Sequence, residues 1–427
     1  MFDNFRQDRH LAHLRQTTER LIGALGESNA QSIAQELVGQ YQQLDPAHRQ
    51  GYFDFLAASF NPDPLKVKAA ADAYAAQPDA RHLVELFKVA EPSRQELLRR
   101  INRAPGGTSA IIGMRQTLLE QLKAKPTWAA IDADMHHLLT SWFNPGFLEL
   151  HEITWKSPAE LLEKIIAHES VHAIDGWDDL RRRLQPDRRC FAFFHRQLPN
   201  EPLIFVEVAL VPAIARDVGV LLDKKTPVGE AKTFKTAIFY SISNCQPGLR
   251  GVSLGNFLIK RVAQKLQADI PTLKVYSTLS PIPGLTRWLD EGASLEGAKL
   301  SDAQLARLAQ ARELLQLPGK TWRDRLKSGW QPSDCSEPEK EALMRLAAAY
   351  LIHRSTERGG DPVAHFHLTN GATLHQLNWA ADLSRKGLQQ YGGLMVNYLY
   401  EPDKVEAQHE AFINGKVIRS RGVDKLL

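Results

Sequence analysis

The clearest chemical pattern in the sequence is the run His168-Glu169-Ser170-Val171-His172, which matches HExxH. On a helix, histidines four residues apart share one face and can hold zinc, while the glutamate between them acts as a general base. The extended form of the motif is missing, because Asp175 and Asp178 stand where its glycine and third histidine would be. Two interpretations remain: a zinc hydrolase that recruits a distant carboxylate such as Glu207, or a helix whose histidines are satisfied by hydrogen bonds. We favour the second and expect no metal site.

A glycine-containing turn lies between an apolar strand-like run at 236–243 and a helical run that ends near Gln267. Its glycines are Gly248, Gly251 and Gly255. Glycines let backbone amides approach an anion, and the helix N-terminus that follows adds the positive end of its dipole. The turn resembles the pyrophosphate-binding turn of the GNAT acyltransferase fold, which holds coenzyme A. Glycines also precede helices that bind nothing, so the turn alone leaves CoA binding open.

A serine and two histidines occupy two runs further along the chain, VYSTLSPIPG at 275–284 and HFHLTNGA at 365–372. Ser280 precedes a proline, a position that also suits the capping of a turn, so its type and place alone do not indicate catalysis. His365 and His367 are two residues apart in a run that looks like a strand, which predicts that both side chains lie on the same face. The residues alone do not say which histidine takes part in chemistry.

The order of these runs resembles the malonyl-CoA decarboxylase family. The matching runs are GNFLIKR at 255–261, LSPIPG at 279–284, HFHLTNGA at 365–372 and NWAAD at 378–382. The resemblance covers residues 150 to 400 well and the first part of the chain by architecture only. It implies an enzyme that converts malonyl-CoA and a proton to acetyl-CoA and carbon dioxide. Malonyl-CoA would be its small-molecule partner, and no cofactor or metal would be needed.

The resemblance also assigns site residues, position by position. It implies that Ser280 and His367 are catalytic. It implies substrate contacts from Arg250, Gly251, Val252, Ser253, Leu254, Gly255, Asn256 and Ile259. Some relatives carry an acidic residue at the position of Ser253, so a carboxylate has no assigned role there. Relatives sent to peroxisomes end in Ser-Lys-Leu, whereas this chain ends in Asp424-Lys425-Leu426-Leu427, so that address is not expected.

The implied reaction suits these residue types. Loss of carbon dioxide leaves charge that the thioester delocalises as an enolate, so hydrogen-bond donors must meet the developing oxyanion and an acid must protonate carbon. The hydroxyl of Ser280 and the backbone amides of the turn are such donors. His367 is the expected proton donor, because the ordinary pKa of histidine, about 6.5, lies close to operating pH.

Three alternatives stay open from the residues alone. A GNAT-type N-acyltransferase would share the CoA turn but would transfer the acyl group to an amine. A zinc hydrolase would use the HExxH run. A non-catalytic CoA-binding or scaffold protein would need neither Ser280 nor His367.

Helical patterns fill the first part of the chain, and mixed patterns fill the rest. Apolar residues recur at helical spacing from residue 5 to about residue 140, and the composition changes at WFNPG, residues 142–146. We therefore expect an all-helical bundle domain at 1–141 and a GNAT-like mixed α/β catalytic domain at 142–427. Within the second domain the patterns predict strands at 190–195, 202–212, 236–243 and 275–279, helices at 254–267 and 301–356, and a final β-like stretch with an Asn414-Gly415 turn.

Composition sets the remaining expectations. The net charge of +4 arises from 53 basic and 49 acidic residues, which fits a small anionic ligand better than nucleic acid. Three cysteines without CxxC spacing favour free thiols, and the sequence shows no leader or membrane-span pattern. We expect a cytoplasmic protein with neither nucleic-acid nor membrane partners. The resemblance adds a homo-oligomer assembled through the helical domain.

Overall fold

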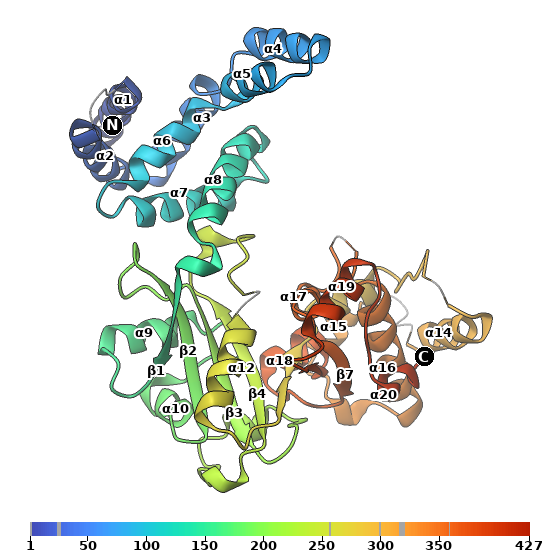
Figure 1. Cartoon of the computed structure of the whole chain (residues 1–427). Coiled ribbons are helices and arrows are strands. Elements are labelled where there is room, and N and C mark those ends of the chain that lie inside the picture. The colour runs from blue at the N-terminus through green and yellow to red at the C-terminus, as the bar shows by residue number, and fades with distance from the viewer. Residues whose placement is uncertain (1, 24–26, 256–257, 299, 316–320, 358) are drawn as a thin grey trace. The chain divides into compact units, whose positions relative to one another are not determined.

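The computed structural model describes residues 2–23, 27–255, 258–298, 300–315, 321–357 and 359–427. Contacts within the chain divide it into two compact units. The first unit holds residues 1–149, 194–203 and 245–254, and the second holds residues 150–193, 204–244 and 255–427. Figure 1 shows the elements of each unit.

The first unit is built from helices, as the spacing of its apolar residues predicts. The helices are α1 (Phe2–Gly23), α2 (Glu27–Gln42), α3 (Pro46–Ser59), α4 (Pro64–Ala76), α5 (Ala80–Ala90), α6 (Ser93–Asn102), α7 (Gly107–Gln121) and α8 (Ala129–Trp142). Two of them begin where an aspartate precedes a proline: Asp45 caps α3 and Asp63 caps α4, each accepting a backbone amide of the first turn. The prediction of an N-terminal helical bundle is confirmed.

Aromatic side chains fill the core of this bundle. Tyr52, Phe53 and Trp128 are buried, and the ring of Trp128 lies 5.1 Å from that of Phe53. The indole N–H of Trp128 donates to Asp54 (2.8 Å), so the polar atom of this ring is satisfied. Because these are the largest apolar side chains of the unit, their removal from water contributes much of its stability.

The hairpin of α4 and α5 is different, because none of its residues is buried. The two helices contact each other, yet Leu65, Val84 and Phe87 remain 79%, 58% and 63% exposed. Exposed apolar side chains gathered on one hairpin are typical of an interaction surface.

The second unit is built on a mixed β-sheet. Its strands are β1 (Leu148–Ile153), β2 (Arg188–His195), β3 (Ile204–Val211), β4 (Thr236–Asn244), β5 (Val275–Thr278), β6 (Ser280–Pro281), β7 (Thr373–Asn378) and β8 (Met395–Tyr400). The order is β1-β2-β3-β4-β5-β8-β6, and β7 pairs with β8. Strands β2 to β4 are antiparallel neighbours, whereas β4 and β5 are parallel and are joined through helix α12 (Leu258–Asp269). The mixed α/β class and the four predicted strands are confirmed, and the glycine turn lies between β4 and α12 as predicted.

Two neighbouring strands of this sheet separate next to Ser280. The parallel pairing of β4 and β5 ends at Phe239 and Thr278, and the amide of Leu279 still donates to the carbonyl of Phe239 (3.1 Å). The chain then turns toward β8, where Ser280 pairs with Val396. Ser280 therefore stands at the point where the sheet opens.

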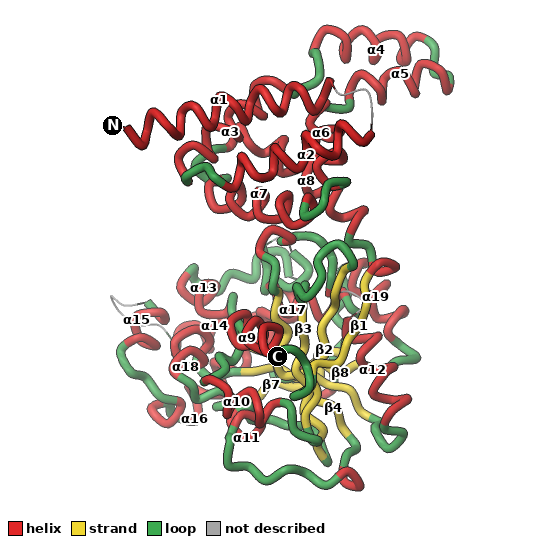
Figure 2. The backbone as a smooth tube through the Cα atoms, turned by 90° about the vertical axis from the view of Figure 1, so that its left-hand side faces the viewer, coloured by secondary structure: helices red, strands yellow, loops and turns green. Residues whose placement is uncertain are grey.

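Helices lie on both sides of the strands. Figure 2 shows α12 and α19 (Val405–Ile413) on one side, and α9 (Ala159–His168) and α10 (Gly176–Arg183) on the other. The other helices of this unit are α11 (Gly219–Leu222), α13 (Leu285–Asp290), α14 (Asp302–Leu314), α15 (Trp322–Lys327), α16 (Glu337–His353), α17 (Pro362–Thr369), α18 (Arg385–Tyr391) and α20 (Arg421–Asp424). The helices predicted at 254–267 and 301–356 correspond to α12 and to α14, α15 and α16.

The prediction for the end of the chain was wrong in one respect. Asn414 and Gly415 do not form a hairpin turn, because Asn414 follows the last residue of α19 and Gly415 has a φ of +77°. A glycine with positive φ just after a helix is a common helix ending, so this Asn-Gly pair ends a helix.

Among the helices of the described ranges, none is long and apolar enough to cross a membrane.

Candidate active site

Ser280 and His367 meet in the second unit, although 87 positions separate them in the chain. Oγ of Ser280 lies 3.0 Å from Nε2 of His367, and the two residues are only 6% and 3% exposed. Oγ of Ser280 also donates to Oγ1 of Thr278 (2.9 Å). The two residues implied to be catalytic thus form one buried hydrogen-bonded pair.

His367 lies on helix α17, so the prediction of a strand for this run was wrong. The helix begins at Pro362, and the carboxylate of Asp361 accepts two backbone amides of its first turn. In a helix, residues two apart point about 200° from one another rather than to the same side. His365 accordingly turns away from the pair, and its Nδ1 lies 3.2 Å from the carbonyl oxygen of Ser355.

Asp361 also connects this helix to the loop that carries Ser280. Its second carboxylate oxygen accepts the amide of Gly284 (2.9 Å), the last residue of the LSPIPG run. A Cβ atom at Gly284 would lie 2.0 Å from the hydroxyl oxygen of Tyr350, so the approach requires glycine. One carboxylate therefore holds the serine loop and the histidine helix in a fixed relation.

Two tyrosines that the sequence patterns did not indicate surround the imidazole of His367. Its Nδ1 lies 2.9 Å from the hydroxyl of Tyr400, and the ring stacks on that of Tyr398 with 4.6 Å between centroids. Both tyrosines are buried and belong to β8. Their spacing of two residues in an apolar run is the signal that could have placed them on one face of a strand.

Burial keeps this site uncharged. Removal from water lowers the pKa of His367 to about 3, so its imidazole is neutral at pH 7. Burial also raises the pKa of Tyr400 well above its ordinary value, so its hydroxyl keeps its proton. Tyr400, His367, Ser280 and Thr278 form a series of neutral hydrogen bonds, which we call the neutral chain.

A cavity of about 300 Å³ adjoins the neutral chain. Tyr400 lines it, together with Ile259 and Ala263 of α12 and Val405 of α19. Ile259 is one of the residues predicted to contact substrate, and it shares the wall of this cavity with Tyr400. The lining is mainly apolar, which suits a neutral organic group better than a phosphate.

The predicted pyrophosphate turn belongs to the first unit as far as Leu254. The side chain of Arg250 is exposed, while the amides of Arg250, Val252 and Leu254 donate to nearby backbone carbonyls. In the described part of the turn, the amides of Gly251 and Ser253 have no such acceptor and are available to an anion. The turn therefore presents alternate amides rather than a continuous cradle.

Each glycine of this turn has a reason that does not involve a ligand. A Cβ at Gly248 would lie 2.1 Å from a backbone oxygen of α7, and Gly251 has a φ of +86°. Gly255 belongs to the second unit, where its Cβ would lie 2.3 Å from the ring of Phe366, the residue before His367. The glycines alone therefore do not indicate a phosphate site. Asn256, the last residue predicted for the turn, lies outside the described residues.

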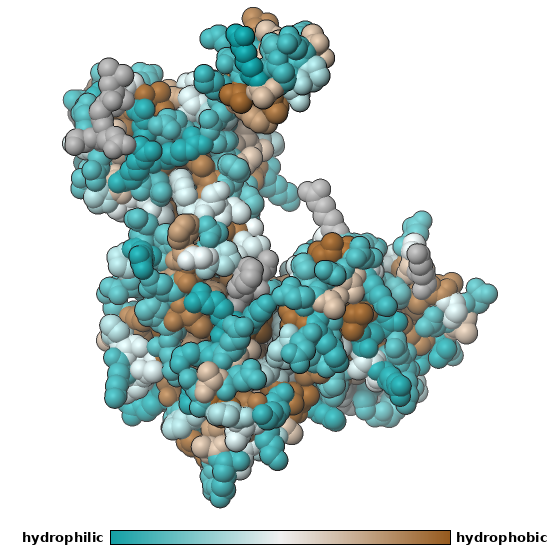
Figure 3. All heavy atoms as spheres, in the orientation of Figure 1, coloured by the Kyte–Doolittle hydropathy of each residue, from teal (hydrophilic) through white to brown (hydrophobic). Residues whose placement is uncertain are grey.

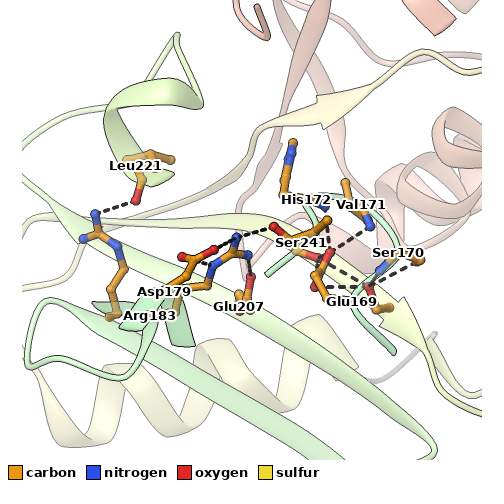
Figure 4. Close-up of polar contacts among 12 residues, drawn as sticks. Glu169, Ser170, Val171, His172, Asp179, Arg183, Glu207, Leu221 and Ser241 are labelled. Atoms are coloured by element: carbon orange, nitrogen blue, oxygen red, sulfur yellow. Dashed lines mark hydrogen bonds and ion pairs between the residues drawn. The ribbon is translucent and has the colours of Figure 1, made fainter. Parts of the chain in front are cut away.

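The HExxH run does not form the helical arrangement that binds zinc. Helix α9 ends at His168, and Glu169 has a ψ of 107°, so His172 is not one helical turn from His168. The carboxylate of Glu169 instead accepts the amides of Val171 (2.7 Å) and His172 (2.8 Å) and the hydroxyl of Ser241 (2.7 Å) (Figure 4). The expectation of one helix carrying both histidines was wrong, because these bonds from a side chain to nearby amides compete with the helix.

Glu207, the distant carboxylate considered as a zinc ligand, is bound by an arginine. Arg183 donates to Glu207 (2.8 Å) and to Asp179 (3.0 Å), and all three side chains are buried (Figure 4). Burial is the main cause that raises the pKa of Glu207 to about 8. Because Asp179 already balances the charge of Arg183, a proton on Glu207 leaves the group neutral. We call these three residues the arginine cluster.

The fold and the site define the class of this protein: an enzyme with a helical N-terminal part, a mixed α/β domain and a buried, uncharged serine–histidine pair. Family models identify it further. Residues 60–143 match the malonyl-CoA decarboxylase N-terminal domain, and residues 146–427 match the malonyl-CoA decarboxylase C-terminal domain. The chain belongs to the malonyl-CoA decarboxylase family, whose members are carboxy-lyases.

Individual relatives extend over both matched regions. The chain is 34% identical to the mitochondrial malonyl-CoA decarboxylase of Anser anser anser over 92% of its own length and 82% of that relative. It is 36% identical to that of Rattus norvegicus, over 77% and 70% of the two chains. The crystal structure of malonyl-CoA decarboxylase from Rhodopseudomonas palustris matches with a TM-score of 0.84 and 40% identity, and that from Agrobacterium vitis with 0.82 and 42%. Each match covers 97% of this chain and 99% of the solved one.

Proposed function

We propose that this chain removes carbon dioxide from malonyl-CoA to give acetyl-CoA, with Ser280 and His367 at the reacting group. Membership of the malonyl-CoA decarboxylase family supports the substrate and the reaction. The observation that carries the choice of residues is the 3.0 Å contact between Oγ of Ser280 and Nε2 of His367. Two runs that are distant in the chain bring a hydroxyl and an imidazole together where water is excluded, which supports a shared chemical role.

The thioester itself accepts the electrons in this reaction. When the carbon–carbon bond to the malonyl carboxylate breaks, carbon dioxide leaves and the electron pair stays on the thioester as an enolate. In the free enzyme the hydroxyl of Ser280 donates to Thr278. When substrate is bound, this hydroxyl turns to the developing oxyanion beside the Nε2–H of His367, and in a dry site hydrogen bonds to an oxyanion are strong. The surrounding apolar and aromatic groups disfavour a buried carboxylate and so favour its loss.

The α-carbon then needs a proton, and we assign its delivery to His367. Burial keeps the imidazole neutral in the free enzyme. The malonyl carboxylate brings a negative charge beside it, and a neighbouring opposite charge raises the pKa of a histidine. His367 then gives its Nε2 proton to carbon as carbon dioxide leaves and takes up a proton from solvent at Nδ1, which balances the reaction and leaves the imidazole neutral.

The substrate contacts implied by the resemblance stay part of this proposal. They comprise Arg250, Gly251, Val252, Ser253, Leu254, Gly255 and Asn256 of the turn, and Ile259 of α12. The exposed guanidinium of Arg250 is the side chain of the turn best suited to a phosphate oxygen.

The test is incubation with malonyl-CoA and no acyl acceptor. We expect equal amounts of acetyl-CoA and carbon dioxide. Ser280→Ala and His367→Ala should each lower turnover by about a hundredfold or more, because each removes a donor at the reacting group. His365→Ala is the matched control, since His365 lies two residues away and points elsewhere, and it should keep most of the activity.

The proposal fails if malonyl-CoA is unchanged on its own and is consumed only when an amine is supplied, which would indicate an N-acyltransferase. It fails in its residues if Ser280→Ala and His367→Ala both turn over at near-normal rates.

We also propose that the chain forms a homo-oligomer through its helical part. The support is the hairpin of α4 and α5, where Leu65, Val84 and Phe87 are exposed and hydrophobic residues appear at the surface (Figure 3). Light scattering should give a smaller mass for the double variant Val84→Glu with Phe87→Glu than for the wild type. Leu383→Glu is the control, because Leu383 is 59% exposed and lies in the second unit.

A cytoplasmic location is the remaining part of the proposal. Its support is that Cys190, Cys245 and Cys335, all in the described part of the chain, are thiols, which suits a reducing compartment. The goose and rat relatives are named as mitochondrial. Fractionation of source cells tests the location.

A further inference from the structure

Thr278 is placed to control the hydrogen of the Ser280 hydroxyl. It is the last residue of β5 and is fully buried. Its Oγ1 accepts two hydrogen bonds, one from the backbone amide of Tyr398 (3.2 Å) and one from Oγ of Ser280 (2.9 Å). The strand amide fixes the position of this oxygen, and the oxygen in turn attracts the serine hydrogen.

The direction of the other hydrogen bonds follows from the number of hydrogens. A serine hydroxyl has one hydrogen, so a hydroxyl that donates to Thr278 can only accept at its 3.0 Å contact with His367. Nε2 of the imidazole must then carry the hydrogen of that bond. Nδ1 then has no hydrogen and acts as an acceptor. The hydroxyl of Tyr400, 2.9 Å away, donates to it.

We propose that Thr278 is a positioning residue which, by taking the Ser280 hydrogen, holds His367 in the tautomer that carries its proton on Nε2. This inference rests on the proposed function, because it matters to the reaction only if Nε2 faces the reacting group. The consequence is that the proton-bearing nitrogen points toward Ser280 before substrate arrives, and no ring flip or proton exchange is needed.

Loss of the Thr278 hydroxyl changes which tautomers of His367 are populated. The hydrogen of Ser280 is then free to turn to Nε2, and the imidazole proton moves to Nδ1. In that state the hydroxyl of Tyr400 must accept from Nδ1, and its own hydrogen loses its partner in a buried place. The protein then holds a mixture of two tautomers, of which one presents a bare nitrogen to the reacting group.

The experiment compares Thr278→Val, which keeps the shape and removes the acceptor, with Thr278→Ser, which keeps the hydroxyl. Histidine labelled with ¹⁵N and ¹³C reports the tautomer of His367 by NMR, and the His367→Gln variant identifies its signal. We expect the Nε2–H tautomer in the wild type and in Thr278→Ser. In Thr278→Val we expect a second tautomer and a fall in kcat of about tenfold, with KM within about twofold.

Each result decides the proposal. A wild type that shows the Nδ1–H tautomer overturns it without any variant. A Thr278→Val protein that keeps the Nε2–H tautomer and its kcat also overturns it, and so does a Thr278→Ser protein as slow as Thr278→Val. If Thr278→Val is too unstable to assay, the wild-type spectrum together with the kcat of Thr278→Ser still decides. If the wild type does not decarboxylate malonyl-CoA, the proposed function fails, while the NMR result still says whether Thr278 sets the tautomer.

Discussion

Two buried polar networks of the second unit, the neutral chain and the arginine cluster, differ in how burial affects their charge. In the neutral chain, burial lowers the pKa of His367 to about 3, so the imidazole gives up its charge. In the arginine cluster, Arg183 keeps its charge and is paired with Asp179 at 3.0 Å. A reaction that moves a proton and expels a carboxylate suits the first network, because its groups are neutral and no ion pair among the described residues holds a charge there. In the arginine cluster, the ion pair of Arg183 with Asp179 fixes the charges, so we assign this cluster a role in stability rather than in the reaction.

Removal of the arginine should give the largest effect. Arg183→Met leaves the buried carboxylate of Asp179 without a counter-charge, and we expect the free energy of unfolding to fall by about 3–5 kcal/mol. Urea denaturation measures it. The control is Arg196→Met, because Arg196 is 87% exposed in its pair with Glu149 and should cost at most about 1 kcal/mol. Equal losses in the two variants would remove the distinction between a locked cluster and an ordinary surface pair.

Acid should destabilise the protein through the neutral chain. The pKa of His367 is about 3 in the folded state and about 6.5 in an unfolded chain, so below pH 6.5 the unfolded chain binds a proton that the native one does not. This contribution is complete above pH 6.5 and is lost as the pH falls toward 3, by about 2 kcal/mol at pH 5. Between pH 7 and pH 5, the free energy of unfolding should fall less steeply for His367→Gln than for the wild type. Parallel curves would show that His367 is not held neutral by burial.

The hydroxyl of Tyr400 tests the neutral chain itself. Tyr400→Phe removes the donor to Nδ1 of His367, and loss of one hydrogen bond, about 1 kcal/mol, should lower kcat roughly fivefold to tenfold. Tyr398→Phe is a close control. It keeps the ring that stacks on His367, and the hydroxyl of Tyr398 has no hydrogen-bond partner among the described residues. A larger effect in Tyr398→Phe than in Tyr400→Phe would contradict the assignment.

The smallest effect is expected for Glu207→Gln at pH 7. Because the pKa of Glu207 is about 8, its carboxyl is protonated at this pH, and an amide of the same shape should change stability by less than about 0.5 kcal/mol. The raised pKa also means that the wild type loses stability as the pH rises from 4.5 toward 8, which Glu207→Gln should not do. Calorimetry at several pH values measures both. A loss at pH 7 like that of Arg183→Met would mean that Glu207 is ionised in the cluster.

The residues proposed for the reaction could be chosen from the sequence, but their geometry could not. Ser280 and His367 stand in runs whose types and order resemble a known family, so the amino-acid sequence is enough to choose both. Their contact depends on the separation of β4 from β5 and on the start of α17, and neither is visible in a local pattern. Tyr400 and Thr278 were missed for the same reason, because each acts through a neighbour that only the sheet brings close.

The wrong predictions share one physical cause. The runs around His367, Glu169 and Asn414 were interpreted by alternation, spacing or residue pair, and each is decided by a side-chain cap or a helix end. Asp361 before a proline starts α17, the carboxylate of Glu169 competes with the end of α9, and Gly415 follows the end of α19. The helical bundle, by contrast, was predicted correctly because its apolar spacing extends over many turns.

Asp361 couples two distant segments of the candidate active site. Its carboxylate accepts the first amides of α17 and the amide of Gly284, so one side chain positions both the loop of Ser280 and the helix of His367. Ser280 and His367, 87 positions apart, therefore depend on the same carboxylate for their positions. A chimera that takes residues 275–290 from a distant homologue should work only if residues 350–370 come from the same parent.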